Sequence, residues 1–278
     1  MRMPKEYKYD PEDVSRFFDE HGEKEWERLV RTPQDRISLH LHTEFLREHV
    51  EPGMKLLEVG AAAGRFTRIL VELNCRVTVT DLSEGQLALN RKKAEELGFA
   101  SGIEDWHRLD MCDMACFLDG DFDAVVCYGG PLSYVFEKAD QALGECCRVL
   151  KNGGIFFSSV MSVWGAAHAF LPSIMYLTSD QIDTILESGD VTPHTDPNNK
   201  HFCHMFRSQE YRDLLERSHL HILDMSSANF LSVNMGEQLE KIMEIPPNWN
   251  ELLRLEKETC RQPGCWDTGT HLIAVCRK

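Results

Sequence analysis

The chain has 278 residues, of which 42% are hydrophobic and 27% charged, and its formal net charge is −15. This composition supplies enough apolar residues for one large domain with an appended cap. Such an acidic chain repels phosphate backbones, which disfavours nucleic acid as a partner. No apolar stretch is long enough to span a bilayer. Its N-terminus lacks the apolar core of a signal peptide, so we expect a cytoplasmic protein with its ten cysteines reduced.

Residues 1–50 are predicted to form an N-terminal helical cap. Between residues 12 and 50, apolar side chains recur at helical spacing, and a break is expected at Pro33. The turn sequence EPG at 51–53 ends this segment, and the periodicity of the sequence changes after it.

From residue 54 onward, short apolar strands alternate with amphipathic helices. The sequences KLLEV, RVTVT, FDAVVCY and IFFSSVM are typical of buried strands. This alternation predicts an α/β fold with a Rossmann-like, doubly wound and mostly parallel sheet, in a domain that spans residues 51–278. Residues 163–207 interrupt the alternation and are expected to form a lid.

The loop after the first predicted strand consists of small residues, from Gly60 through three alanines to Gly64. A ligand can approach the backbone of such a loop closely, and the helix that follows offers free N–H groups and the positive end of its dipole. The next strand ends about 20 residues further on, at Asp81, where a carboxylate suits a grip on two ribose hydroxyls. Together these features predict a site for a nucleotide-like cofactor.

Two patterns of glycine spacing are typical of cofactor loops of this kind. Dinucleotide-binding loops require a third small residue where this chain has Arg65, so that pattern fits poorly. The pattern E-x-G-x-x-x-G is present as Glu58, Gly60 and Gly64, and it resembles motif I of the class I S-adenosylmethionine-dependent methyltransferases. The middle glycine of that motif is replaced here by Ala62. An NAD-dependent oxidoreductase and a cofactor-binding partner protein without catalytic activity remain as alternatives.

The resemblance extends from about residue 37 to residue 278 and is greatest to small-molecule methyltransferases of the ubiquinone-pathway type (the methyltransferase type 11–12 group). The sequence VTVTDLSEGQLALN resembles the second family motif, RLDMCDM the third and FDAVVCYGGPLSYV the fourth. The resemblance implies that Asp81 binds the ribose, that Leu82, Asp110 and Met111 contact the adenine, and that residues near Tyr128 flank the methionine portion. The implied S-adenosylmethionine site comprises Glu58, Gly60, Ala61, Gly64, Asp81, Leu82, Gln86, Asp110, Met111, Cys127 and Tyr128.

The same resemblance implies a seven-stranded sheet in the order 3-2-1-4-5-7-6 whose last strand, HLIAVC, is antiparallel to its neighbours. The implied reaction is methyl transfer to a small-molecule acceptor by in-line displacement. A general base helps where the acceptor carries a proton. The acceptor atom and the oligomeric state remain open.

Candidates for the acceptor side lie in two segments, HFCHMFR and YGGPLSY. One of the two histidines is predicted to take a proton from the acceptor, although a purely structural role is an equal alternative. The arginine is predicted to pair with an acidic group of the acceptor. No metal is expected, because the histidines and Cys260 and Cys265 lack a standard zinc spacing. The catalytic candidates are His201, His204 and Tyr128, and the substrate-binding candidates are Ser133, Tyr134 and Arg207.

Overall fold

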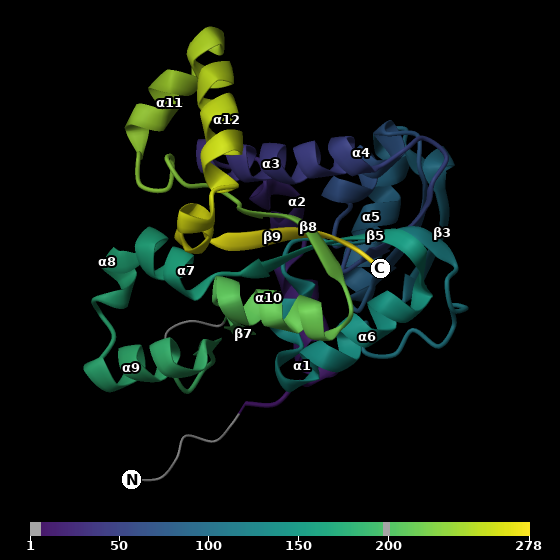
Figure 1. Cartoon of the computed structure of the whole chain (residues 1–278), viewed down its shortest axis with the longest axis horizontal. Helices are drawn as coiled ribbons and strands as arrows, with labels where there is room; N and C mark the ends of the chain where they lie inside the picture. The colour runs from purple at the N-terminus through teal and green to yellow at the C-terminus, as the bar shows by residue number, and fades with distance from the viewer. Residues whose placement is uncertain (1–6, 197–200) are drawn as a thin grey trace.

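The computed structural model describes residues 7–196 and 201–278 and has a seven-stranded sheet at its centre (Figure 1). The strand order is β3-β2-β1-β4-β5-β9-β8; β9 runs antiparallel to both β5 and β8, and the other neighbouring strands are parallel. The predicted fold class, strand order and reversed last strand are therefore confirmed. The strands are β1 (Lys55–Val59), β2 (Arg76–Asp81), β3 (Ile103–Arg108), β4 (Phe122–Cys127), β5 (Leu150–Met161), β8 (His221–Ser227) and β9 (His271–Arg277).

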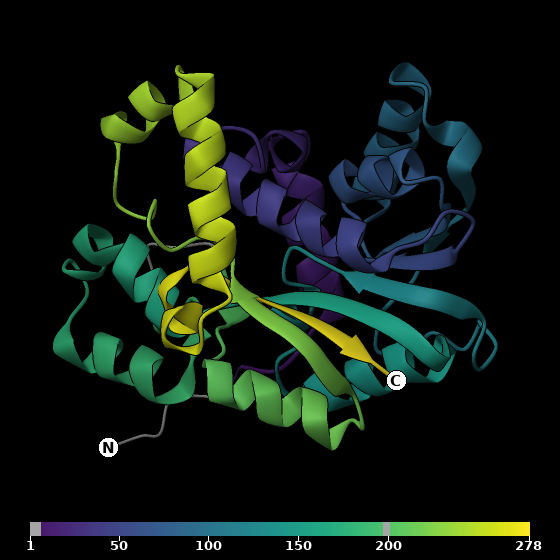
Figure 2. The same ribbon diagram turned by 45° about the horizontal axis from the view of Figure 1, so that its top comes forward.

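Helices cover both faces of the sheet (Figures 1 and 2). One face packs against α6 and α10, and the other against α3, α4, α5 and α12. The longer helices are α1 (Pro11–His21), α3 (Pro33–His49), α4 (Arg65–Glu72), α5 (Glu84–Glu96), α6 (Ala139–Val149), α9 (Ser179–Ser188), α10 (Ser208–Arg217) and α12 (Pro246–Cys260). The shorter ones are α2 (Lys24–Arg28), α7 (Val163–Ala169), α8 (Leu171–Ile174) and α11 (Glu237–Met243). None of the helices in the described ranges is both long and apolar enough to cross a membrane.

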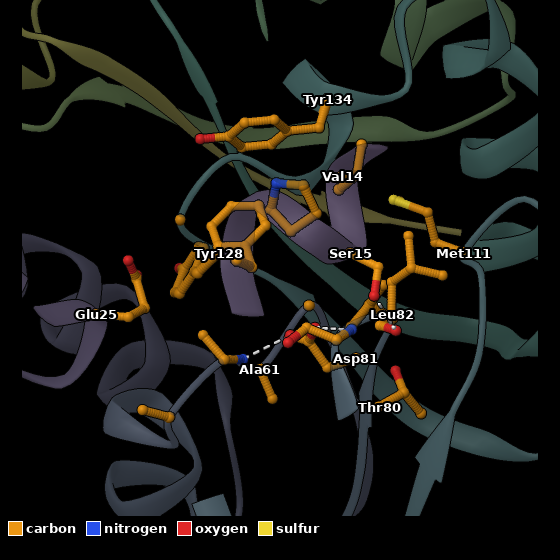
Figure 3. A pocket seen from close by; sticks show the side chains of 18 of the residues that line it. Val14, Ser15, Glu25, Ala61, Thr80, Asp81, Leu82, Met111, Tyr128 and Tyr134 are labelled. Atoms are coloured by element: carbon orange, nitrogen blue, oxygen red, sulfur yellow. Dashed lines mark hydrogen bonds between the residues drawn. The ribbon is translucent and has the colours of Figure 1, made fainter. Parts of the chain in front are cut away.

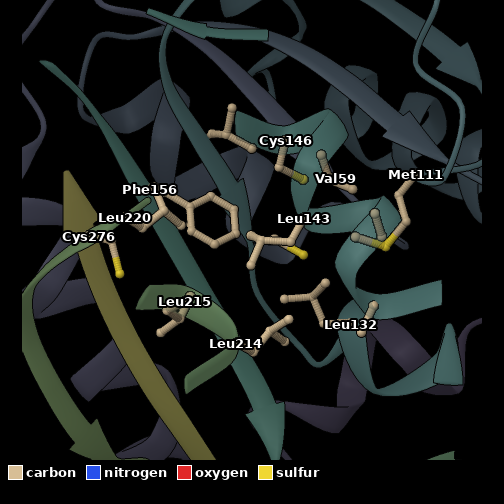
Figure 4. Packing of buried hydrophobic residues seen from close by; sticks show 14 of the residues in the cluster. Val59, Met111, Leu132, Leu143, Cys146, Phe156, Leu214, Leu215, Leu220 and Cys276 are labelled. Carbon is tan, nitrogen blue, oxygen red and sulfur yellow. The ribbon is translucent and has the colours of Figure 1, made fainter. Parts of the chain in front are cut away.

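The two faces are filled by alternate side chains of the same strands, because successive residues of a strand point to opposite sides. Leu56 and Leu57 on β1 are both fully buried, one in each of the two hydrophobic clusters. Figure 4 shows the cluster between the sheet and helices α6 and α10, in which Leu143 and Leu214 approach Phe156 of β5. The core thus fixes the sheet from both sides and leaves the carboxyl ends of β1, β2 and β4 for the loops that follow.

The N-terminal region is helical as expected within its described residues; residues 1–6 lie outside them. Helix α1 packs on α5, where the Asp19 carboxylate accepts hydrogen bonds from the Ser83 hydroxyl and the Gly85 amide. Helix α3 begins with a capping box between Thr32 and Asp35 and packs into the core under the sheet. The division of the chain at residue 50 stays a prediction.

The segment expected to form a lid contains α7, α8, α9 and a two-stranded hairpin, β6 (Asp190–Val191) with β7 (Cys203–His204). Residues 197–200 of this segment lie outside the described residues. Helices α7 to α9 gather at one side of the molecule, next to α10 (Figures 1 and 2). No described residue of 163–207 lines the cavity beside the sheet, so a lid function stays a prediction.

Candidate functional site

A cavity lies at the carboxyl ends of β1, β2 and β4. Its walls come from α1 and α2, the loop after β1, the end of β2 and the segment after β4 (Figure 3). In that view Asp81, Leu82 and Met111 lie toward one side of the cavity and Glu25 toward the opposite side. The predicted residues that line the cavity are Gly60, Ala61, Asp81, Leu82, Met111, Tyr128 and Tyr134.

The small residues of the loop are required by its backbone conformation. Gly60, Ala62 and Gly64 all have positive φ angles, of 66°, 48° and 94°. A Cβ at Gly60 would lie 2.6 Å from Cγ of Pro131, and one at Gly64 would lie 2.8 Å from the side-chain nitrogen of Asn90. Ala62 stands where the family motif has glycine, and its left-handed conformation costs about 1 kcal/mol. The loop can therefore bring its bare backbone to the cavity wall.

Asp81 connects the end of β2 to this loop. Its two carboxylate oxygens accept hydrogen bonds from the amides of Ala62 and Ser83, each at 2.8 Å. Burial raises the pKa of Asp81 to about 6, although these amide hydrogen bonds act in the opposite direction. Each oxygen keeps a second lone pair, and Asp81 lines the cavity, so the carboxylate can accept further hydrogen bonds from a ligand.

Glu58 lies beneath the loop and does not line the cavity. Its side chain is 2% exposed and accepts a hydrogen bond of 2.6 Å from the Thr67 hydroxyl. The Thr67 oxygen in turn accepts from Asn90, which also donates to the Ala62 carbonyl. Burial raises the pKa of Glu58 to about 8. The structure thus gives Glu58 a role in ordering the loop, and a contact with the cofactor stays a prediction.

The structure corrects the prediction that Gln86 belongs to the cofactor site. Its side chain is fully buried and donates hydrogen bonds to the carbonyls of Phe18 and Gly22, so it anchors α1 rather than facing the cavity. Four further predicted residues also lie off the cavity wall. Gly64 follows the loop residues that line it and lies next to the Asn90 side chain. Cys127 is buried in the hydrophobic core, Ser133 accepts from the Met161 amide, and Asp110 caps the turn after β3 by accepting from the Cys112 amide.

His204 is held between two carboxylates and does not line the cavity, so its prediction as an acceptor-site base is corrected. Nδ1 lies 2.7 Å from Asp190 and Nε2 lies 2.9 Å from Glu210. Burial by itself lowers the pKa of His204, but the hydrogen bonds to these carboxylates outweigh it and raise the pKa to about 9. With both ring nitrogens donating, the imidazolium links the hairpin to α10 and has no lone pair for catalysis.

This ion-paired histidine predicts a pH-dependent stability. Because the folded pKa lies above the ordinary value of 6.5, the contribution is fully present below about pH 6.5 and is lost as pH rises through 9. We expect His204→Gln to lower the free energy of unfolding by about 2–3 kcal/mol at pH 6 and by much less at pH 9.5. Urea unfolding at the two pH values measures this. The exposed His221, changed to Gln, is the control, and an equal loss at both pH values would contradict the prediction.

Arg207 is also corrected, because it lies away from the cavity. Its guanidinium donates to the Leu186 carbonyl and lies 5.7 Å from the ring centre of Trp164. These contacts attach the beginning of α10 to α9 and α7. An acidic group of an acceptor in the cavity would not reach it.

The structure brings Tyr134 and His201 together. The Tyr134 hydroxyl lies 2.8 Å from Nε2 of His201, and the Tyr134 side chain lines the cavity. Burial and, to a smaller extent, the nearby Arg28 guanidinium lower the pKa of His201 to about 4, so the ring is neutral at ordinary pH. A neutral Nε2 can accept a hydrogen bond from the tyrosine and so fix the direction of its hydroxyl.

Sequence reasoning missed two charged residues of the cavity, Glu25 and Arg28. Both lie on α2, and their i, i+3 spacing places them on one face of this short helix. Nε of Arg28 donates to Glu25 at 2.7 Å, and the Glu25 side chain is 7% exposed. The spacing E-x-x-R was the available signal, but it does not tell which face of the helix is buried.

Comparison with known proteins adds to this geometry. Residues 57–158 match the model of a methyltransferase domain family. A ubiquinone biosynthesis O-methyltransferase of Methylocella silvestris is 28% identical over 172 residues, which cover 55% of this chain and 64% of the relative. The chain thus spans less than two thirds of that relative's length.

Two solved structures share the fold over nearly the whole chain. The [4+2]-cyclase SpnF has a TM-score of 0.61 at 17% identity, covering 100% of this chain and 99% of its own. Geranyl diphosphate C-methyltransferase from Streptomyces coelicolor A3(2) has a TM-score of 0.58 at 15% identity, and the match covers 96% of this chain and 97% of that one. Residues 57–158 are thus a methyltransferase domain, and the fold of the chain and its loop after β1 are those of the class I methyltransferases, whose cofactor is S-adenosylmethionine.

Proposed function

We propose that this protein transfers a methyl group from S-adenosylmethionine to a small-molecule acceptor. One observation carries the proposal: the backbone of the loop at residues 60–63 and the Asp81 carboxylate face the same cavity. A loop without Cβ atoms at its ends, a buried carboxylate with free lone pairs and the apolar side chains of Leu82 and Met111 fit an adenosyl group. The net charge of −15 and the likeness to a ubiquinone biosynthesis enzyme both favour a small molecule over nucleic acid as acceptor.

The cofactor, when bound, supplies an already activated methyl group on a sulfonium. The chain must therefore hold the acceptor in line with that group and keep water away from it. Phe18 and Tyr134 contribute an apolar wall, with ring centres 5.1 Å apart. The Tyr134 hydroxyl, directed by His201, supplies a fixed polar group at this wall. We infer that Tyr134 positions the acceptor and that His201 acts through it.

Loss of this hydrogen-bonded pair is expected to reduce turnover more than cofactor affinity. We expect Tyr134→Phe and His201→Ala each to lower kcat at least about tenfold, which corresponds to roughly 1.4 kcal/mol, because the acceptor loses its orientation. The Kd of S-adenosylhomocysteine should stay within about twofold of the wild-type value. His194→Ala, an exposed histidine of the same segment, is the control. Unchanged kcat in both variants would remove the pair from the site.

The proposed function is tested by cofactor choice and by transfer. S-adenosylhomocysteine should raise the melting temperature and NAD should not, because only the former matches the loop. Incubation with labelled S-adenosylmethionine and a metabolite extract should then label one small molecule, which identifies the acceptor. Stabilisation by NAD alone would support an oxidoreductase.

Binding of S-adenosylhomocysteine without transfer in any extract would support a cofactor-binding partner. The measurement of methyl transfer is needed because the fold alone does not determine the activity. One solved structure with this fold is that of a [4+2]-cyclase.

A further inference from the structure

Helices α7 and α8 carry an apolar surface that is open to solvent. Ten large apolar side chains are exposed in the described residues, and five of them lie between positions 164 and 176. Single exposed apolar residues are normal, but a group of them is typical of an interaction site. Their exposed fractions range from 44% to 90%. We call these five residues the α8 face: Trp164, Phe170, Leu171, Met175 and Tyr176.

The backbone places these side chains close to one another. The helical hydrogen bonding of α8 continues past its last residue, because the amides of Met175 and Tyr176 donate to the carbonyls of Leu171 and Ser173. Leu171 and Met175 are four positions apart and therefore share one side of this turn. Helix α7, which carries Trp164, packs against α8. The α8 face thus lies on one part of the molecule, at its outer margin (Figures 1 and 2).

The rest of the described chain leaves this part of the molecule poorly covered. No residue at positions 166–188 is buried. On α9 the apolar residues Ile182, Ile185 and Leu186 share one side, at helical spacing, and are only half-buried. Helices of a stable domain bury their apolar side against another element. The insertion therefore has apolar surface for a further partner.

The α8 face is also free of charge. Residues 152–179 contain no aspartate, glutamate, lysine or arginine, in a chain whose net charge is −15. Two copies of this chain repel each other over most of their surfaces, but at an uncharged face they can meet without opposing like charges. The exposed parts of the five side chains amount to roughly 600 Å², compared with about 800 Å² that each partner buries in a standard interface. The face can therefore supply most of a dimer contact.

We propose that a second copy of this chain covers the α8 face, in a symmetric dimer in which α8 of one protomer packs on α8 of its partner. This inference does not depend on the proposed function. Two-fold symmetric dimers are the commonest assemblies of soluble proteins, and both copies use the same surface. Aromatic residues and methionine are enriched at the centres of protein interfaces, and charged residues are depleted there. The α8 face has this composition, and Tyr176 is its most exposed member.

The charges beside this face argue against a lipid bilayer as its occupant. Helices that lie on a membrane carry lysine or arginine on their polar side. Helices α7 and α8 have neither, and α9 presents Asp180, Asp183 and Glu187. The anionic surface of a membrane also repels a chain with a net charge of −15. A second copy of the chain is therefore favoured over a bilayer.

Sedimentation equilibrium of the full chain tests the proposal. The wild type should form a species of twice the chain mass of 31.9 kDa, with a Kd in the micromolar range. Met175→Glu places like charges opposite each other in the contact and should raise this Kd at least about tenfold. Leu118→Glu makes the same charge change at a leucine that is 78% exposed and lies outside the face, so its Kd should stay within about twofold of wild type.

A second variant removes apolar surface without adding charge. The double change of Leu171 and Tyr176 to glutamine should also raise the Kd at least about tenfold. Trp164 is left in place because the Arg207 guanidinium packs on its ring. Far-UV circular dichroism shows whether each variant keeps its fold. A rise in salt from about 0.05 M to 0.5 M should lower the wild-type Kd, because salt screens the repulsion between the acidic chains, whereas a contact made by ion pairs would weaken.

The proposal is overturned if the wild type stays at 31.9 kDa at concentrations up to roughly 0.5 mM, where a micromolar Kd would give almost complete dimer. Dimerisation of both α8-face variants as tight as that of wild type would also overturn it. Binding of the monomer to phosphatidylcholine vesicles, lost in Met175→Glu, would assign the face to a bilayer instead. Because no residue of the α8 face lines the cavity, the variants should bind S-adenosylhomocysteine as wild type does. Failure of the wild type to bind S-adenosylhomocysteine would reject the proposed function and leave the measured mass unaffected.

Discussion

Replacing Asp81 with asparagine is expected to weaken the binding of S-adenosylhomocysteine by about 30- to 1000-fold, equivalent to roughly 2–4 kcal/mol. The carboxylate lines the cavity and accepts amide hydrogen bonds from Ala62 and Ser83, so it can organise the loop and bind two hydroxyls at once. In asparagine an NH2 group takes the place of one carboxylate oxygen, so a hydrogen-bond donor would face the N–H donor of the backbone. Isothermal titration calorimetry with S-adenosylhomocysteine measures the loss.

A second experiment measures how the binding of S-adenosylhomocysteine by the wild-type chain depends on pH. Burial holds the pKa of Asp81 near 6, so the wild type should bind S-adenosylhomocysteine more weakly as pH falls below 6 and the carboxylate takes up a proton. Asp81→Asn should lose this dependence. Asp105→Asn, an exposed carboxylate on β3, is the control. Binding by Asp81→Asn within about threefold of wild type would show that the carboxylate does not hold the ligand.

The features predicted well from the sequence are those determined by neighbouring residues. The apolar strand ending at Val59, the small residues that follow and the strand ending at Asp81 are local patterns, and the parallel sheet brings their ends to one edge. The strand order came from the family resemblance rather than from the residues themselves. Its confirmation accounts for the correct placement of the loop and Asp81 at a shared cavity.

The predictions that failed depend on partners that are distant in the sequence. His204 is next to Asp190 only because β6 pairs with β7 in the hairpin, and no sequence motif predicts that pairing. Gln86 is turned to the carbonyl of Phe18 by the packing of α1 on α5. Arg28 was missed for the converse reason, since a charged five-residue helix has no apolar stripe to indicate its buried face.

Replacing Gly60 with alanine is expected to lower the free energy of unfolding by about 2–4 kcal/mol. Two effects add in this variant: an alanine at φ +66° is strained, and its Cβ would lie 2.6 Å from Cγ of the Pro131 ring. Relief of the contact requires the loop or the segment after β4 to move, and both form the cavity wall. We therefore also expect the binding of S-adenosylhomocysteine to weaken more than about tenfold.

Gly53 supplies a matched control, because its φ of +85° strains an alanine equally while a Cβ there has no atom within 4 Å. Gly53→Ala should therefore cost only the backbone strain, about 1–2 kcal/mol, and leave the binding of S-adenosylhomocysteine unchanged. Urea unfolding and calorimetry on both variants separate strain from contact. Equal losses of stability and equal binding in the two variants would mean that the approach of the loop to Pro131 does not shape the cavity, and the small residues would then serve only the turn.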